Sequence, residues 1–193
     1  MGSSSIEFAH APLLQGDNLN LRPWRAGDLP IFAAMSADQQ VMRHFPGLLS
    51  RAESDAFVAT IQERFDRWGF GFWAVETPDF PFAGFVGLSR PGFEAHFTPA
   101  VEVGWRLRRE AWGKGLATAG ARLALSFGFE RGGVDEIVAL APKVNTPSQA
   151  VMRRLGMRSD PADDFDHPAL ADHPALQRCV LYRIGRAAWA RRA

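Results

Sequence analysis

The alternation of apolar and polar positions predicts a strand near the middle of the chain, followed by a helix. Between residues 101 and 107 the apolar side chains fall on one side of an extended segment: Val101, Val103, Trp105 and Leu107. The other side carries Glu102, Gly104 and Arg106, which is the two-residue period of a strand. From Leu116 the apolar period changes to steps of four, three and four, through Gly120, Leu123 and Phe127. This second period is typical of a helix with one buried face.

Similar patterns predict the other elements. Further strands are expected at 19–22, 70–76, 83–89, 135–140 and 178–184, with the second and third of these pairing as a hairpin. Asp28 is placed to cap a helix that runs to about Ala37, and Ser50 with Glu53 forms a capping-box pattern. Asn145 caps a later helix. Segments 91–100 and 160–175 are predicted loops, and 186–193 is a predicted solvated tail.

This interleaving of strands and helices indicates a mixed α/β or α+β fold, with helices on both faces of one sheet. The chain has 193 residues, of which 47% are hydrophobic, and this is enough for one good core. Neither repeats nor a linker interrupt the pattern, so we expect a single domain over 1–193, with 1–10 flexible.

Composition excludes several functional classes. The balance of 22 basic against 21 acidic residues argues against a nucleic-acid binder. The sequence has no apolar run near the ~20 residues that a membrane span needs, and its first residues do not resemble a secretion signal. One cysteine fits a reducing compartment, so we expect a cytoplasmic protein. The five histidines lack metal-ligand spacing, and we expect no metal site.

Gly113 and Gly115 lie between the central strand and its helix. A glycine-rich turn at a helix start leaves backbone N–H groups pointing outward at the positive end of the helix dipole. Such a turn can cradle a pyrophosphate. The spacing fits neither a Walker loop, because Lys114 is followed by glycine, nor a dinucleotide fingerprint, because Thr118 stands at the third position. The alternative, that the two glycines only cap a helix, stays open at this point.

Four segments carry a resemblance to a known family. The sequence W-G-K-G-L-A-T at 112–118, between a strand and an alanine-rich helix, resembles the acetyl-CoA site of the GNAT superfamily of N-acetyltransferases. The family pattern Q/R-x-x-G-x-G/A falls on Glu110, Gly113 and Gly115, with an acidic residue at its first position. Residues 19–28 and the N-x-x-S helix at 145–157 are also similar to the family. D-D-F-D-H-P at 163–168 resembles the branch of ribosomal-protein N-terminal acetyltransferases (RimJ/RimL-type).

This resemblance implies a mixed sheet of six or seven strands, splayed open in the middle. It also implies that acetyl-CoA, as co-substrate, lies beside the strand at 101–107, with its phosphates on the glycine turn. The residues implied to contact it are Val103, Trp105, Trp112, Gly113, Lys114, Gly115, Leu116, Ala117, Thr118 and Asn145.

The implied chemistry is direct attack of an amine on a thioester, so no protein nucleophile is needed. Glu102 is the preferred general base, acting through a water molecule; the alternative is a strand glutamate paired with an arginine. A backbone N–H near Gly104 or Trp105, where the strand could bulge, would stabilise the oxyanion. By similarity, Ser148 approaches the sulfur as acid or donor. Tyr182, the only tyrosine, lies outside the helix where many relatives place one as the acid.

The acceptor is the open part of the prediction. A protein N-terminus and a small amine, such as an antibiotic or a polyamine, both fit, and so does a non-catalytic CoA-binding sensor. Polyamines and aminoglycosides need several carboxylates, and the dense acidic cluster is Asp163, Asp164 and Asp166. The acceptor pocket is expected from loops 40–50, 91–100 and 160–176. Asp166 and His167 could border it.

Side chains outside the family motifs receive structural interpretations. Cys179 is expected to be a buried thiol in the last strand, and His96 with Phe93 and Phe97 an aromatic cluster, usually part of a core. Both a monomer and a homodimer are compatible with the sequence.

Overall fold

A computed structural model describes residues 11–191 of the chain. Its strands are β1 (Leu14–Gln15), β2 (Asn20–Arg22), β3 (Phe72–Glu76), β4 (Gly84–Ser89), β5 (Val101–Leu107), β6 (Glu136–Pro142), β7 (Arg158–Ser159), β8 (Phe165–Asp166) and β9 (Arg178–Gly185). The α-helices are α1 (Asp28–Ser36), α2 (Gln39–Met42), α3 (Arg51–Trp68), α4 (Leu116–Glu130), α5 (Thr146–Leu155), α6 (Pro174–Gln177) and α7 (Arg186–Ala190). Short 3₁₀ turns are η1 (Arg109–Ala111), η2 (Pro161–Asp163) and η3 (Pro168–Leu170).

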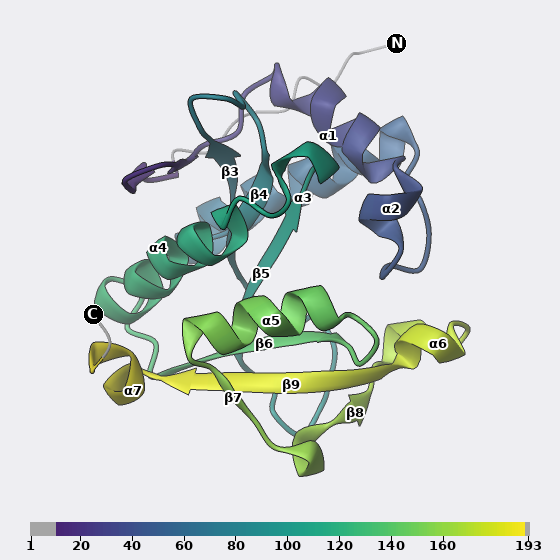
Figure 1. The fold of residues 1–193 in the computed structure, drawn as a ribbon, viewed down its shortest axis with the longest axis vertical. Coiled ribbons are helices and arrows are strands. Elements are labelled where there is room, and N and C mark those ends of the chain that lie inside the picture. Colours follow the sequence, from purple (N-terminus) through teal and green to yellow (C-terminus); the bar gives the residue numbers. More distant parts are fainter. Residues whose placement is uncertain (1–10, 192–193) are drawn as a thin grey trace.

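The strands form one mixed sheet in the order β1-β2-β3-β4-β5-β6-β9-β7, with β8 also paired to β9. In this described part the sheet has nine strands, of which β1, β7 and β8 are two residues long. β5 and β6 are the parallel pair, and they are joined only at Val101 with Ile137 and Glu102 with Val138. Beyond Glu102 the two strands separate, and Figure 1 shows β5 rising steeply away from β6 and β9. This confirms the predicted splayed mixed sheet.

Helices cover both faces of the sheet, as the sequence predicted. On one face Phe32 of α1 and Phe57 of α3 pack against Phe85 of β4, with ring centroids 5.7 to 6.0 Å apart. On the other face α4 approaches closely enough that a Cβ on Gly120 would lie 3.2 Å from the Val86 side chain. At that distance a Cβ on Gly120 would require the Val86 side chain to shift by a few tenths of an ångström, so the glycine allows the close approach of α4 to the sheet.

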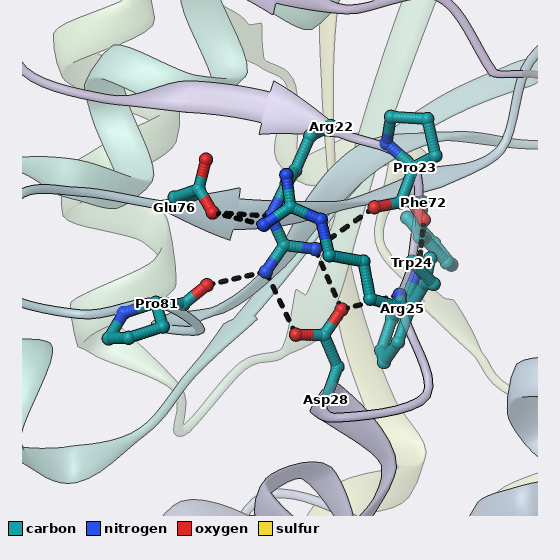
Figure 2. A network of polar contacts seen from close by, with 8 residues as sticks. All are labelled: Arg22, Pro23, Trp24, Arg25, Asp28, Phe72, Glu76 and Pro81. Atoms are coloured by element: carbon teal, nitrogen blue, oxygen red, sulfur yellow. Dashed lines mark hydrogen bonds and ion pairs between the residues drawn. The ribbon is translucent and has the colours of Figure 1, made fainter.

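A buried network joins the start of α1 to the sheet (Figure 2). The guanidinium of Arg22 donates to both carboxylate oxygens of Asp28, at 2.7 and 2.8 Å, and to Glu76 at 2.8 Å. It also donates to the carbonyls of Pro23 and Pro81. Every direction of this planar cation is therefore matched by an oxygen, which fixes the point where α1 leaves the sheet.

Two predictions about helix ends have different outcomes. The capping box is confirmed: Ser50 accepts from the amide of Glu53 at 3.2 Å, and Glu53 accepts from that of Ser50 at 2.7 Å. The cap at Asp28 was wrong, because Gly27 is the cap and Asp28 is the first helical residue. The carboxylate of Asp28 accepts instead from Arg22 and from the amide of Arg25.

Three further expectations need correction. Residues 186–190 form α7 instead of a solvated tail, because Trp189 is buried against Phe129. Segment 160–175 is not a plain loop, since it includes η2, β8 and η3. The bulge near Gly104 is absent, because all six residues of β4 pair one-to-one with β5 from Leu107 to Glu102. The expected flexible segment 1–10 lies outside the described residues.

Candidate functional site

A cavity of about 840 Å³ lies among α2, β5, the turn before α4 and the start of α5. From α2 and the residues after it the lining includes Gln40, Val41, Arg43, His44 and Phe45. From β5, η1 and α4 it includes Trp105, Arg106, Leu107, Ala111, Trp112, Gly113, Gly115, Leu116, Ala117, Thr118, Ala119 and Arg122. From the cap and body of α5 it includes Asn145, Pro147, Ser148, Ala150, Val151 and Arg154. The volume suits a ligand of cofactor size.

The turn at the start of α4 presents free backbone donors to this cavity. Gly113 and Gly115 have φ of 74° and 76°, which L side chains rarely adopt. A Cβ at either glycine would meet nothing within 4 Å, so the space over the turn is open. Among residues 11–191 the amides from Gly113 to Thr118 have no hydrogen-bond partner, and bonding resumes at Ala119. The turn therefore has the properties of an anion cradle.

The cavity is strongly basic. Its charged or titratable lining consists of Arg43, His44, Arg106, Arg122 and Arg154, with no aspartate or glutamate among the lining residues. Arg122 and Arg154 come from α4 and α5, which are adjacent helices. Burial and the nearby Arg43 lower the pKa of His44. A polyanion such as the phosphates of a coenzyme fits this charge distribution.

Glu102 lies at the last register position that β5 shares with β6. Burial raises the pKa of its carboxyl to about 7, and the positive charge of Arg64 on α3 opposes part of that shift. Within residues 11–191 the carboxylate makes neither a hydrogen bond nor an ion pair, and Arg64 instead donates to Ser89 at 3.0 Å. The simple alternative of a glutamate in a salt bridge is therefore not what the structure shows. A carboxyl that titrates near neutrality is suited to accept protons at pH 7.

The start of α5 brings Asn145 and Ser148 to the cavity. The side-chain oxygen of Asn145 accepts from the amide of Ser148 at 3.2 Å, which confirms Asn145 as the helix cap. Its side-chain NH₂ stays available as a donor. Ser148 lines the cavity, as predicted. Tyr182 is buried on β9, where its hydroxyl accepts from Arg153 at 3.2 Å, and it is not a lining residue.

Most of the predicted coenzyme-contacting residues line the cavity: Trp105, Trp112, Gly113, Gly115, Leu116, Ala117, Thr118 and Asn145. Three of the predicted site residues do not. Val103 is buried at 3% exposure, and Lys114 turns toward Phe80 and Asp79. Glu102, which is partly exposed, lies at the last register position that β5 shares with β6. Their roles stay predictions.

Of the three loops expected to form the acceptor pocket, 40–45 lines this cavity. Loop 91–100 lines a separate pocket of about 660 Å³, and the place of the acceptor stays a prediction. Asp163, Asp164 and Asp166 form ion pairs, in that order, with Arg183, Lys143 and Arg178.

Phe93 and Phe97 form a second apolar cluster with Phe165. The side chain of His167 accepts a hydrogen bond from the amide of Ala169. Cys179 is fully buried as expected, and burial raises its pKa to about 11.

Arg106 is one of four arginines in the lining that the sequence analysis did not single out, with Arg43, Arg122 and Arg154. It is 8% exposed, and its guanidinium carbon lies 4.1 Å from the centroid of the Phe45 ring. The available signal was its place on the same strand side as Glu102, an arginine on the more polar face of a central strand. That pattern does not indicate whether the guanidinium of Arg106 has a hydrogen-bond partner, because such a partner would come from residues far away in the sequence.

Comparison with known proteins identifies the family. The model of the acetyltransferase (GNAT) domain matches residues 18–158 of the chain. The chain belongs to the GNAT acetyltransferase family. Bacillus subtilis YkkB is 27% identical over 143 residues, covering 73% of this chain and 82% of YkkB. The FsC-acetyl coenzyme A-N(2)-transacetylase of Aspergillus fumigatus is 30% identical over 128 residues, covering 64% of this chain and 53% of that enzyme.

Solved structures agree on the GNAT fold. A GNAT-family acetyltransferase from Bacillus anthracis superposes with a TM-score of 0.74 at 20% identity, covering 91% of this chain and 99% of its own. RimL, a ribosomal L7/L12 alpha-N-protein acetyltransferase in complex with coenzyme A, gives 0.72 at 17% identity, with coverages of 92% and 99%. Family membership makes this GNAT protein an acetyl-CoA-dependent acyltransferase, and the open amide turn and basic lining fit that co-substrate.

None of the helices within residues 11–191 is both long and apolar enough to cross a membrane. Groups of three or more histidine, cysteine or acidic side chains that could hold a metal ion are absent from the same residues.

Proposed function

We propose that this GNAT protein transfers the acetyl group of acetyl-CoA to a primary amine by direct attack in a ternary complex. The single observation that carries the proposal is the open turn from Gly113 to Thr118, whose unpartnered amides face a basic cavity. The same cavity reaches Ser148, and the splayed strand β5 leads from it to Glu102. Binding at one end and proton acceptance at the other are the two requirements of this reaction.

The backbone of 113–118 and the side chains of Arg122 and Arg154 would hold the phosphates. Asn145 would donate its free amide hydrogens to the pantetheine arm, and the exposed edge of β5 beyond Glu102 would align it. Acetyl-CoA supplies the activated carbonyl carbon. The protein's contribution is alignment, because holding two reactants in register converts a bimolecular step into a nearly unimolecular one.

Glu102 would act as the general base through a water molecule. An ammonium acceptor must lose a proton before its nitrogen can form the new bond to carbon, and the carbon–sulfur bond then breaks. A carboxyl with a pKa of about 7 is half deprotonated at neutral pH, which balances availability against basicity. Ser148 would donate a hydrogen bond toward the departing sulfur.

The acceptor is proposed to be a peptide or protein N-terminus in preference to a polyamine or aminoglycoside. Polycationic acceptors require carboxylates, and none lines the cavity, since Asp163, Asp164 and Asp166 are paired elsewhere. The similarity in fold to RimL is compatible with this choice, although at 17% identity it shows the fold alone. The 163–168 segment adds the sequence resemblance to the same branch.

The direct test is release of free CoA from acetyl-CoA with a panel of amines, including short peptides, amino acids and polyamines. We expect turnover with some of these amines, and saturable acetyl-CoA binding by calorimetry. Failure to bind acetyl-CoA at millimolar concentration would end the proposal. Among active amines, a strong preference for spermidine over peptides would reject the acceptor class and keep the chemistry.

Glu102→Gln separates an enzyme from a CoA-binding sensor. For the enzyme, this change should reduce turnover by about 10²- to 10⁴-fold and leave the dissociation constant of CoA within twofold. Glu63→Gln is the matched control, because Glu63 is exposed on α3 and lies outside the cavity lining. Wild-type CoA binding without turnover on any amine of the panel would favour the sensor.

A further inference from the structure

The guanidinium of Arg106 is a buried charge without a polar partner. Its Nε and Nη1 atoms are shielded from solvent and have no hydrogen-bond partner within residues 11–191. The nearest groups are aromatic: its central carbon lies 4.1 Å from the Phe45 ring, 5.3 Å from Phe85 and 5.5 Å from Phe57. Ring faces stabilise a cation, but they accept no conventional hydrogen bonds in the guanidinium plane.

A buried guanidinium without a hydrogen-bond partner lowers the stability of the folded protein unless a ligand supplies the partner. A buried polar group without a partner loses its hydration free energy, and a buried charge loses more. Burial lowers the pKa of Arg106 to about 10, which still leaves it charged at neutral pH. In this same fold Arg22 is also buried and is fully hydrogen-bonded, so the chain does build carboxylate partners for a buried arginine.

The cavity is the place where a partner for Arg106 can enter. Arg106 lines it together with Arg43 and His44, and no acidic side chain does. The amide turn and Arg122 with Arg154 stand at the α4 and α5 side, where the coenzyme phosphates are proposed to bind. Arg106 belongs instead to the side formed by α2 and β5. Arg43 lies over the ring of Trp112 in the glycine turn, 5.4 Å from its centroid, whereas Arg106 lies among the rings of Phe45, Phe57 and Phe85. Arg106 is therefore the basic lining residue that the amide turn and the α4–α5 arginines leave without an assigned ligand.

The position of Arg106 along β5 relates this residue to the proposed base. Glu102 and Arg106 are four residues apart in one strand and so project from the same face. At about 3.3 Å per residue their Cα atoms are about 13 Å apart. An acceptor that brings its amine to Glu102 can therefore place an anionic group near Arg106 only if that group is several bonds away from the amine.

We propose that Arg106 binds a carboxylate of the acceptor, and that the preferred acceptor is an amine carrying this carboxylate at a distance on the order of 13 Å. This inference rests on the proposed function, because it assumes acetyl transfer at Glu102. A short peptide with an acidic residue near its N-terminus and an ω-amino acid both supply this chemistry. Arg106 is then a specificity-determining residue, with Phe45, Phe57 and Phe85 holding its guanidinium in place.

The test compares acceptors that differ only in the carboxylate. One arm uses alanine tetrapeptide amides with one glutamate at position two, three or four, each against the glutamine peptide. The other arm uses ω-amino acids of increasing chain length, each against its terminal amide. We expect the wild-type protein to prefer the acid by at least tenfold in kcat/KM in one arm, with an optimum at one spacing. The arm that shows the preference identifies the source of the carboxylate.

Arg106→Gln should reduce the acid-to-amide ratio to within about twofold of unity. Arg106→Lys keeps the charge without the planar fork, and should retain part of the ratio. Arg108→Gln is the matched control, because Arg108 follows on the same segment, pairs with Glu110 and lies outside the cavity lining. It should keep the wild-type ratio. CoA affinity, measured by calorimetry for each variant, should stay within twofold of wild type.

Equal kcat/KM for acids and amides in wild type overturns the inference and leaves acetyl transfer intact. A preserved ratio in Arg106→Gln also overturns it. A tenfold loss of CoA affinity in Arg106→Gln would assign the residue to the coenzyme, which overturns it as well. If Arg106→Gln does not fold, the wild-type ratio and Arg106→Lys still decide. Absence of turnover on every amine, together with absence of acetyl-CoA binding, is the distinct result that rejects the proposed function.

Discussion

Two buried arginines illustrate two ways in which this chain uses charge. Arg22, at 2% exposure, is surrounded by Asp28, Glu76 and two backbone carbonyls, whereas Arg106, at 8%, is surrounded by phenylalanine rings. Their pKa values move in opposite directions. Burial alone would lower the pKa of Arg22, but its hydrogen bonds and charges from Asp28 and Glu76 raise it. Burial lowers the pKa of Arg106 to about 10 with nothing to offset it.

The difference separates a structural role from a ligand-binding role. All hydrogen-bond donors of the Arg22 guanidinium already have partners, so it cannot bind a ligand. Its network instead fixes the position at which α1 starts. The face of β5 that carries Glu102 and Arg106 is the opposite case, because both groups lack hydrogen-bond partners within residues 11–191. Unsatisfied charges beside a cavity mark the places where a substrate can supply the missing partner.

The largest expected effect is on the Arg22 network. Asp28→Ala leaves the Arg22 cation buried with fewer partners, and removing one member of a buried ion pair costs about 3 to 5 kcal/mol of the free energy of unfolding. Urea denaturation followed by circular dichroism measures this. Asp55→Ala is the control, because Asp55 pairs with Arg51 on an exposed helix face and should cost below about 1 kcal/mol. Equal losses for the two variants would contradict the contrast.

The second prediction concerns the unsatisfied arginine. Arg106→Met replaces a buried, unpartnered charge with an apolar chain, a change that is often neutral or stabilising. Removing the unpartnered charge raises the free energy of unfolding, and losing the three ring contacts offsets part of that gain. We therefore expect the free energy of unfolding to stay equal or to rise by up to about 2 kcal/mol. Urea denaturation provides the value. A decrease beyond about 2 kcal/mol would show that Arg106 is part of the structural framework.

The third prediction is the pH dependence set by Glu102. With a pKa of about 7, the base is protonated at lower pH, so kcat/KM should fall about tenfold for each pH unit below 7. The folded chain also retains a proton that the unfolded chain loses above about 4.5, so this group lowers the free energy of unfolding as pH rises from 4.5 to 7. A CoA-release profile and urea denaturation across pH measure both. An activity profile flat from pH 5.5 to 8 would contradict the role of Glu102.

The smallest expected effect concerns Arg64, whose positive charge lowers the pKa of Glu102. Arg64→Gln removes that charge, so the midpoint of the activity profile should move to higher pH by a fraction of a unit. Arg67→Gln, an exposed arginine on the same helix, is the control and should leave the midpoint in place. A midpoint that moves to lower pH would show that Arg64 does not act on Glu102 through its charge.

Much of the site could be predicted because its main parts are local in sequence. The glycine turn at 113–115 depends on residues a few positions apart, and the Asn145 cap depends on a three-residue spacing. The structure confirms both the turn and the cap. The acceptor side could not be predicted in this way. Of three candidate loops only 40–45 reaches the cavity, and Asp163, Asp164 and Asp166 are taken up by partners on other segments. Pairing between distant side chains follows from packing and leaves no local pattern.

Errors at particular residues have the same origin. Aspartate is a residue type that often caps helices, but the buried guanidinium of Arg22 competes more strongly for the carboxylate of Asp28 than a backbone amide does. Trp189 lies in a basic segment that looks solvated, yet Phe129 offers it an apolar surface. In both cases a tertiary contact outweighs a local preference of about 1 kcal/mol.

The sequence by itself determined the strand–turn–helix that forms the amide cradle, the mixed fold and the family, because these depend on periodicity and on glycine backbone freedom. Only the tertiary structure decided which charges are neutralised. Arg22 and Arg106 look alike in the sequence, each on a strand and each followed by an apolar or proline residue. Folding places Asp28 and Glu76 against the first and an open cavity against the second. Whether a charged side chain has a partner depends on its neighbours in the folded structure, and for this reason the proposal of an acceptor-binding role for Arg106 needed the folded chain.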